Sequence, residues 1–199
     1  MIVIGLTGSI AMGKTETAKM FAKLGIPVCD SDAIVHELYD RGGAAVKPIK
    51  DLFPDTVVGG RVDRARLAAR MAKEPDAFQL VESIVHPLVY REQQRFLERC
   101  RTQQARMVVI DIPLLFETGR DRDVDYIVVV SAPPEIQRAR ALERPGMTEE
   151  RFETLIARQT PDAQKRARAD FVVDSSQGRD HAFAQVRGIV AKLVADSDD

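Results

Sequence analysis

Residues 2–24 combine a short apolar run, an octapeptide with glycines at two fixed positions, and a helical pattern, in that order. The run over residues 2–7 fits a buried strand. The octapeptide Gly8-Ser9-Ile10-Ala11-Met12-Gly13-Lys14-Thr15 fits G-x-x-x-x-G-K-S/T, the phosphate-binding loop. Apolar residues at positions 18, 21, 22 and 24 then recur at helical offsets. Strand, loop and helix follow one another as this motif requires, so the stretch predicts a site for a triphosphate.

The chemistry expected of this loop follows from its residue types. Its glycines let backbone amides approach an anion closely, and those amides converge at a helix N-terminus, which favours negative charge. The motif places Lys14 on the β- and γ-phosphates and the Thr15 hydroxyl on Mg²⁺. We therefore expect ATP with Mg²⁺ to be held by the loop residues Gly8, Ala11, Met12, Gly13, Lys14, Thr15 and Glu16.

Composition limits the remaining function classes. The chain has 199 residues, enough for one compact domain, and its formal net charge of −1 argues against a dedicated nucleic-acid or membrane-surface protein. Cys29 and Cys100 lie in apolar contexts, which predicts buried free thiols and a reducing cytoplasm. The sequence shows no secretory leader and no run long enough to span a bilayer. We expect a cytoplasmic protein, a monomer or small homo-oligomer, without a nucleic-acid or membrane partner.

Strand and helix patterns alternate along most of the chain. Apolar runs at 26–29, 107–111, 124–130 and 171–173 predict further strands. Such alternation predicts a parallel α/β sheet, in which ligands collect beyond the carboxyl ends of the strands. Residues 32–104 are rich in helical patterns and poor in strands, which predicts a helical region inserted into that core. Pro87 is expected to end or kink a helix there.

Two aspartates follow predicted strands and are open to two interpretations each. Asp32 either caps a helix, contributing about 1 kcal/mol, or accepts the proton of a hydroxyl that attacks the γ-phosphate. Position alone favours neither role, and the two are compatible. Asp111 is either a capping or loop carboxylate or a Walker-B aspartate, which holds Mg²⁺ directly or through water.

Basic residues gather in the last third of the chain. Arg138, Arg140 and Arg144 are predicted to share a helix, with the last two on one face. Further basic residues follow at positions 151, 158, 165, 166 and 168. This pattern indicates either a solvated basic face or a mobile lid whose guanidinium groups meet a transferring phosphate. Of the histidines, His86 precedes Pro87 at a predicted helix junction, whereas His36 and His181 have the pattern of surface residues.

Taken together, these stretches resemble the dephospho-CoA kinase family over nearly the whole chain. The H-P, P-L-L-F-E and Q-x-x-R-x-x-x-R elements, in this order, are far more specific than the loop alone. The matching residues are Gly5-Leu6-Thr7-Gly8, Gly13-Lys14-Thr15, Phe21, Gly25, Asp30-Ser31-Asp32, Gly60-x-x-Asp63-Arg64-x-x-Leu67, Glu82-x-x-x-His86-Pro87, Pro113-Leu114-Leu115-Phe116-Glu117, Gln137-x-x-Arg140-x-x-x-Arg144, Gln159 and Ala169-Asp170.

The resemblance implies a P-loop kinase fold and a phosphotransfer reaction. It implies a five-stranded parallel core (1–31, 105–133 and 169–199), a helical acceptor-binding region (32–104) and a lid (about 134–168). The implied reaction moves the ATP γ-phosphate to the ribose 3′-hydroxyl of dephospho-CoA. By position, the expected catalytic residues are Asp32 as base, Lys14 and Arg140, with Arg144 on ATP. The acceptor side is expected to include Asp32, Arg64, His86, Pro113, Leu114, Leu115 and Glu117.

The chain departs from the family pattern at two places. The family's loop commonly reads G-G-I-G-S-G-K-S/T, whereas Ser9, Ala11 and Met12 stand here at wildcard positions of the general motif. Ala11 and Met12 restrict the loop more than glycine would. The turn over residues 174–178 also replaces the family's usual D-N-x-G.

Three other classes of protein share a phosphate-binding loop. A nucleoside or nucleotide kinase of the same fold is the main alternative, and the H-P and P-L-L-F-E elements argue against it. A GTP-dependent switch needs N-K-x-D, which a chain without Asn lacks. A nucleic-acid motor is disfavoured by the small size and near-neutral charge.

Overall fold

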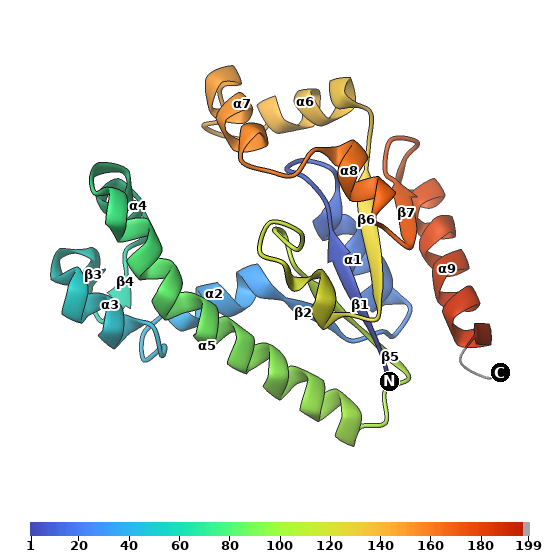
Figure 1. Ribbon diagram of the computed structural model, residues 1–199, viewed down its shortest axis with the longest axis horizontal. Coiled ribbons are helices and arrows are strands. Elements are labelled where there is room, and N and C mark those ends of the chain that lie inside the picture. Colours follow the sequence, from blue (N-terminus) through green and yellow to red (C-terminus); the bar gives the residue numbers. More distant parts are fainter. Residues whose placement is uncertain (197–199) are drawn as a thin grey trace. The chain divides into compact units, whose positions relative to one another are not determined.

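The computed structural model describes residues 1–196, and the chain forms two compact units (Figure 1). Unit 1 consists of residues 1–29 together with the chain from residue 100 onward. Unit 2 is Asp30–Arg99. The phosphate-binding motif therefore lies in unit 1, and most of the predicted helical region forms unit 2.

Unit 1 is built on a five-stranded sheet with the order β2-β5-β1-β6-β7. Strand β1 pairs in parallel with both β5 and β6, and β6 pairs in parallel with β7. The predicted parallel α/β fold is thus confirmed. Strand β5 is buried along its whole length, as its uninterrupted apolar sequence indicates. The strands are β1 (Ile2–Thr7), β2 (Val28–Asp30), β5 (Met107–Asp111), β6 (Tyr126–Ser131) and β7 (Phe171–Asp174).

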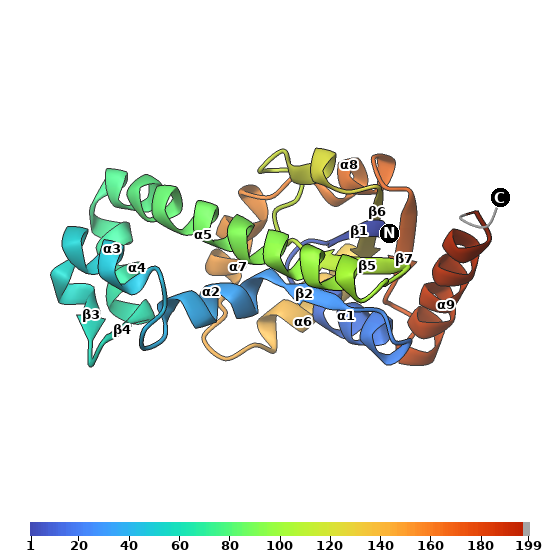
Figure 2. The ribbon, with the colours of Figure 1, turned by 90° about the horizontal axis from the view of Figure 1, so that it is seen from below.

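Helices α1 and α9 cover one side of this sheet, and the segment between β5 and β6 lies on the other (Figure 2). The helices bury Phe21, Val186 and Leu193 against Ile4 of the central strand. This packing anchors the start of α1, where the phosphate-binding loop ends. The elements are α1 (Lys14–Lys23), α9 (Arg179–Asp196) and a short 3-10 helix, η2 (Arg120–Asp123).

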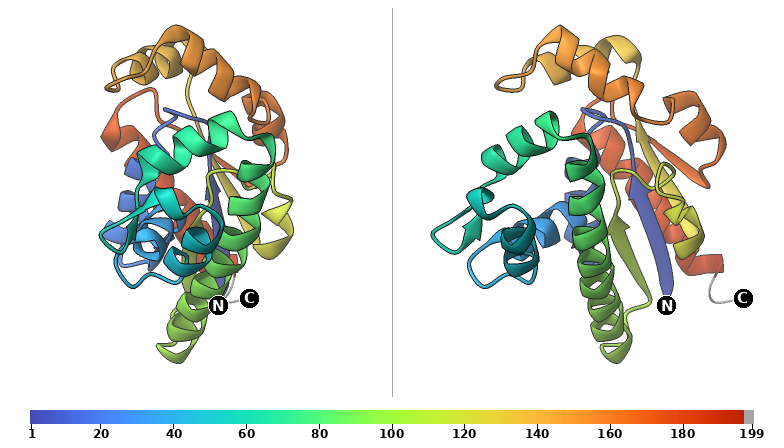
Figure 3. Two further views of the ribbon diagram at one scale, coloured as in Figure 1. Left: turned by 90° about the vertical axis from the view of Figure 1, so that its left-hand side faces the viewer. Right: turned by 60° about the vertical axis from the view of Figure 1, so that its left-hand side comes forward.

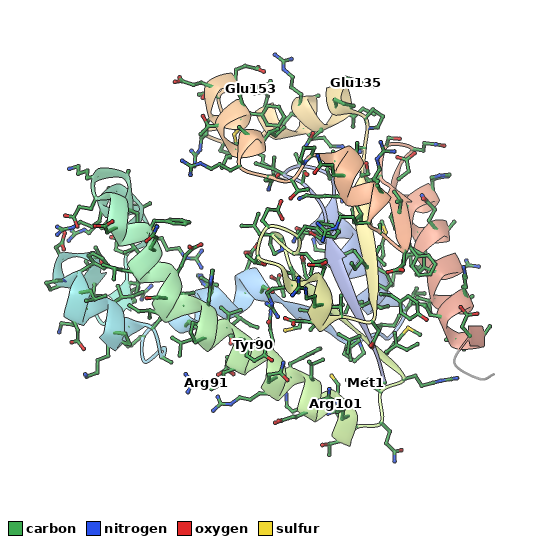
Figure 4. All side chains as sticks on the ribbon, in the orientation of Figure 1. Met1, Tyr90, Arg91, Arg101, Glu135 and Glu153 are labelled. Carbon is green, nitrogen blue, oxygen red and sulfur yellow. The ribbon has the colours of Figure 1, made fainter. Side chains whose placement is uncertain are left out.

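Three further helices follow β6, and the first two lie beyond the carboxyl ends of the strands (Figure 3). The first two of them contribute Ala141 and Phe152 to a small apolar cluster that also includes Ala11 of the phosphate-binding loop. Glu135 and Glu153, labelled in Figure 4, are exposed on the outer side of α6 and α7. The three helices are α6 (Pro134–Leu142), α7 (Glu149–Ala157), which is capped by Thr148, and α8 (Asp162–Ala167).

Unit 2 has a separate apolar core formed by its helices, with Leu38, Ile49, Leu67 and Val81 among its buried members. A two-stranded hairpin, β3 (Val57–Val58) and β4 (Arg61–Val62), stands where only helices and turns were predicted. The two glycines between its strands both have positive φ, which suits a tight hairpin turn. The helices are α2 (Ser31–Tyr39), α3 (Val46–Leu52), η1 (Pro54–Thr56), α4 (Arg64–Lys73) and α5 (Pro75–Thr102).

Helix α5 is one continuous helix of 28 residues, and Pro87 lies inside it. The sequence predicts two helices meeting near Pro87, so the predicted helix end is wrong. A proline at this position deprives the Ser83 carbonyl of its usual N–H partner. Both Ser83 and Pro87 are exposed, so water can satisfy that carbonyl and the helix can continue.

Two predictions from composition are tested by the described residues. Neither Cys29 nor Cys100 forms a disulfide, and both are buried, as predicted. Within residues 1–196, no helix combines the length and the apolar character that crossing a bilayer requires.

Candidate functional site

The phosphate-binding loop joins β1 to α1, as the motif predicts. Gly13 has φ 94°, and a Cβ there would lie 3.2 Å from Ser175 Oγ, so both backbone and space favour glycine. Ala11 has φ 62°, a left-handed conformation that costs a non-glycine residue on the order of 1 kcal/mol. The loop of this chain therefore adopts glycine-like backbone geometry at a position occupied by alanine.

Lys14 and Asp111 form an ion pair at the carboxyl end of the sheet. Lys14 is the first residue of α1, and its Nζ donates a hydrogen bond to Asp111 Oδ1. Asp111 ends β5 and is 4% exposed. It lies next to the loop because Leu6 of β1 pairs with it across the sheet. Of the two interpretations of Asp111, this position beside Lys14 supports the Walker-B role.

The neighbouring loop residues offer oxygen ligands for a hard cation. Thr15 is exposed, and Asp111 supplies a carboxylate nearby through its pairing with Lys14. Magnesium usually keeps several waters and binds through one or two protein oxygens plus substrate phosphates. Within residues 1–196, no group of three or more His, Cys, Asp or Glu side chains is arranged to hold a metal ion. These two oxygen donors fit a cation that arrives with ATP.

Glu16 lies in the first turn of α1 and is partly exposed. Its carboxylate accepts a hydrogen bond from Lys19 Nζ at 2.7 Å and lies 2.9 Å from an Arg179 guanidinium nitrogen. The hydrogen bond from Lys19 is the main reason that the pKa of Glu16 is lowered. The predicted contact of Glu16 with ATP stays a prediction.

Arg140 is connected to the loop through Ser175. The Arg140 guanidinium donates to Ser175 Oγ and to the Ser175 carbonyl, both at 2.8 Å. Ser175 Oγ in turn donates to the Met12 carbonyl at 2.7 Å. The lid arginine predicted from the sequence is thus brought to the phosphate-binding loop, with the 174–178 turn between them. No local sequence signal identifies Ser175, because its partners lie far away along the chain.

Arg144 is placed differently from the prediction. Helix α6 ends at Leu142, so Arg144 lies beyond it and does not share a helical face with Arg140. The Arg144 backbone N–H donates to Ala141, and its side chain is exposed. The chain turns here because Pro145-Gly146 follows. A contact of Arg144 with ATP stays a prediction.

Much of the remaining basic face consists of ion pairs. Arg138 donates two hydrogen bonds of 2.6 Å to Glu149. Arg166 lies 3.0 Å from Asp162, and Arg168 lies 2.7 Å from Asp121. For these residues the solvated-face interpretation describes the structure. Arg140 differs from them, since it donates to a hydroxyl and a carbonyl.

Glu117 connects the P-L-L-F-E segment to the helices that follow β6. Its Oε1 accepts a hydrogen bond from the Thr160 backbone N–H at 2.7 Å and lies 3.0 Å from Lys165 Nζ. Lys165 is fully buried. Burial alone would raise the pKa of Glu117, but the hydrogen bonds from the Thr160 N–H, from its own N–H and from Lys165 together lower it. Lys165, which the sequence shows only as part of a basic run, is therefore the counter-ion of Glu117.

The other residues of this segment have different exposures. The Pro113 carbonyl accepts a hydrogen bond from Thr7 Oγ1 at 3.3 Å, which attaches the segment to the end of β1. Leu115 is fully buried, whereas Leu114 is 41% exposed. Among the leucines predicted to contact the acceptor, only Leu114 presents its side chain to solvent.

Asp32 lies in unit 2, in the first turn of α2, with its side chain exposed. The helix is capped by Asp30, whose Oδ1 accepts from the N–H groups of Asp32 and Ala33. The interpretation of Asp32 as the cap is therefore wrong. Between the two aspartates, Ser31 accepts a 2.8 Å hydrogen bond from buried Gln93. The backbone at Asp32 is fixed by its neighbours, while its own carboxylate is left accessible.

Arg64 and His86 also lie in unit 2. The Arg64 guanidinium lies 5.8 Å from the centre of the Tyr39 ring, at the start of α4. His86 Nε2 lies 3.6 Å from Glu82 on the same helix. The side chains of both residues are exposed. The predicted acceptor residues thus divide between the units, with Asp32, Arg64 and His86 in unit 2 and residues 113–117 in unit 1.

Comparisons with known proteins agree on one family. The family model described as dephospho-CoA kinase matches residues 2–180. The chain is 56% identical over 195 residues to a dephospho-CoA kinase of Agrobacterium fabrum, covering 98% of this chain and 100% of that one. A crystal structure of a Thermus thermophilus protein is 33% identical, with a TM-score of 0.84 over 96% of this chain and 97% of the other. A dephospho-CoA kinase from Campylobacter jejuni, 18% identical, shares the fold with a TM-score of 0.74, over 98% of both chains.

Proposed function

The chain belongs to the dephospho-CoA kinase family, and we propose that it phosphorylates the ribose 3′-hydroxyl of dephospho-CoA with ATP, the last step of coenzyme A biosynthesis. The observation that carries this proposal is the extent of the match. It runs from residue 2 to residue 180 and so includes every proposed site residue, from Gly8 to Arg144. The buried free thiols support a cytoplasmic location.

In the proposed reaction, the loop of unit 1 binds the phosphates of ATP. Backbone amides of residues 8–15 surround the β- and γ-phosphates, and the Lys14 ammonium exchanges Asp111 for phosphate oxygen. Thr15 and Asp111 would hold Mg²⁺, directly or through water. When bound, this ion neutralises charge that develops on the phosphate oxygens.

Arg140 is proposed to stabilise the phosphate during transfer. Its two hydrogen bonds to Ser175 must break before its guanidinium reaches the γ-phosphate. The transition state of phosphoryl transfer is largely dissociative, so positioned cations contribute more than covalent chemistry. The helices α6–α8 would act as the lid that carries Arg140 and excludes water from the reaction.

The acceptor is proposed to bind with its 3′-hydroxyl at Asp32. An exposed carboxylate on a fixed helix start is suited to accept the hydroxyl proton as the phosphate is transferred. Arg64, His86 and residues 113–117 would contact the rest of dephospho-CoA. In residues 113–117, exposed Leu114 supplies contact surface, and buried Leu115 supports the segment from below.

The acceptor specificity can be tested by a coupled assay of ADP release. Dephospho-CoA is compared with AMP, adenosine and pantothenate at equal concentrations, and the product is identified by mass spectrometry. We expect rapid ADP release with dephospho-CoA alone, together with a product heavier by one phosphate. If dephospho-CoA gives no acceleration, the proposed function is wrong. Faster turnover with AMP or adenosine would instead favour a nucleotide or nucleoside kinase.

A further inference from the structure

Two glutamines with no role so far both bind main-chain groups of one residue of the phosphate-binding loop, Ile10. Gln137, on α6, donates from Nε2 to the Ile10 carbonyl at 2.8 Å. Gln159, between α7 and α8, accepts from the Ile10 backbone N–H on its Oε1 at 3.0 Å. Side chains of the α6–α8 segment therefore satisfy both the backbone N–H and the carbonyl of Ile10.

This contact is enclosed by apolar packing. Gln137 is 6% exposed, so the loss of its partner would leave a buried polar group unpaired. The Ile10 side chain packs against the cluster formed by Ala11, Ala141 and Phe152. Ala11 is therefore packed against the same α6–α8 segment that provides the two glutamines.

The next two residues explain why the loop needs such support. Ala11 adopts the left-handed conformation that glycine adopts easily, and alanine persists there only when its surroundings fix it. On its other side, the Met12 carbonyl accepts the hydrogen bond from Ser175. Residues 10 and 12 are each tied to side chains outside the loop, and the strained residue lies between them.

We propose that Gln137 and Gln159 are positioning residues, which hold the loop in its ATP-binding shape by clamping the peptide groups of Ile10. The proposal rests on the proposed function only in taking ATP as the ligand of this loop. Neither glutamine needs to touch the nucleotide. The clamp connects the conformation of the loop to the α6–α8 segment. A movement of that segment therefore changes the position of the backbone amides that bind the phosphates.

The first test replaces each glutamine by methionine, which has a similar volume but cannot make these hydrogen bonds. Binding of a non-hydrolysable ATP analogue with Mg²⁺ is measured by calorimetry for Gln137→Met, Gln159→Met and, as a control, Gln164→Met. Gln164 is exposed on α8. We expect the dissociation constant to rise about tenfold for the first two and to stay unchanged for the control. The KM for ATP should rise in parallel, with the KM for dephospho-CoA unchanged.

The second test separates hydrogen bonding from charge. Gln137→Glu and Gln159→Glu bring the same charge to the main chain of the same residue, Ile10. Gln159→Glu keeps an acceptor for the Ile10 N–H, whereas Gln137→Glu loses the donor and sets a carboxylate against the Ile10 carbonyl. We expect analogue binding to weaken at least about tenfold more in Gln137→Glu than in Gln159→Glu. The clamp is wrong if the two glutamate variants weaken analogue binding equally. It is also wrong if both methionine variants bind the analogue as tightly as the Gln164→Met control.

Two readouts keep these tests decisive. Should Gln137→Met fail to fold, the partly buried Gln159 decides, with normal analogue binding by Gln159→Met rejecting the proposal. The analogue binds without an acceptor, so these comparisons do not depend on which hydroxyl is phosphorylated. Wild-type protein that binds the analogue but is not accelerated by dephospho-CoA would reject the proposed function and leave the clamp standing.

Discussion

At the scale of single residues, substitution of Lys14 is expected to have a large effect on catalysis. Lys14→Ala removes the cation proposed for the phosphates and, with it, the ion pair to buried Asp111. We expect a loss of about 3 kcal/mol or more of transition-state stabilisation, measured as kcat/KM for ATP. Lys19→Ala is the matched control on the same helix, since Lys19 is exposed and pairs only at the surface with Glu16. Near wild-type turnover by Lys14→Ala would contradict the assigned role.

Substitution of Arg140 should lower turnover while leaving nucleotide binding nearly unchanged. In the structure its guanidinium is bonded to Ser175, so Arg140→Ala should change the affinity for ATP alone only slightly. We expect kcat to fall by about a hundredfold or more, since a positioned arginine acts on the transition state. Arg138→Ala, two positions earlier and paired with Glu149, serves as control and should keep its activity. Similar kcat values for the two variants would refute the distinction.

What the sequence reveals at this scale depends on whether partners are close in the chain. The loop residues follow one another, so their roles are predictable from spacing. Met12, Arg140 and Ser175 are joined only by the tertiary fold, and Lys165 meets Glu117 in the same way. Asp30, rather than Asp32, is the helix cap because it is the residue that leaves the strand with extended backbone.

At the scale of elements, the Glu117–Lys165 pair attaches the P-L-L-F-E segment to α8. Lys165→Met should be less damaging than Glu117→Gln, because only the latter leaves a fully buried ammonium without a counter-charge. We expect Glu117→Gln to lower the free energy of unfolding by about 3 kcal/mol at neutral pH. Urea denaturation of both variants and of the double variant measures the coupling. Additive losses would show that the pair does not stabilise the fold.

The same pair predicts a pH dependence. The pKa of Glu117 is lowered from 4.5 in the folded protein, so its stabilising contribution is complete above that value. This contribution is lost as the pH falls through the lower pKa of the folded state. The difference in unfolding free energy between wild type and Glu117→Gln should therefore shrink as the pH falls into the acid range below about 4.5. A constant difference over that range would show that Glu117 is not the titrating group.

Helices and strands can be predicted from the sequence wherever the spacing of apolar residues determines which of the two forms. The five core strands follow from apolar runs, with β2 and β6 displaced by a residue or two from their predicted positions. Helix α5 shows the limit, because a local rule about Pro87 predicts a break that exposure to water makes unnecessary. The β3–β4 hairpin was missed since its strands have only two residues each, too few for a period to appear.

At the scale of the whole molecule, the proposed base and the proposed ATP site lie in different units, so variants of the two should affect different steps of the reaction. Asp32 lies in unit 2, whereas the phosphate-binding loop lies in unit 1. We expect Asp32→Asn to lower kcat at least about tenfold while calorimetry shows unchanged binding of the ATP analogue. Asp40→Asn, exposed just after the same helix, is the control. Turnover by Asp32→Asn near that of the control would show that Asp32 is not the base.

The order of strands in the sheet also has a consequence for how the chain is made. Strand β1 comes first in sequence but lies in the middle of the sheet, and its neighbours are β5 and β6. Ile2 pairs with Met107, so β1 leaves the ribosome about a hundred residues before β5, the first strand with which it pairs. Parallel pairings over such distances form slowly. Until then an unpaired apolar strand is exposed to aggregation, which makes early protection by a chaperone a benefit to this topology.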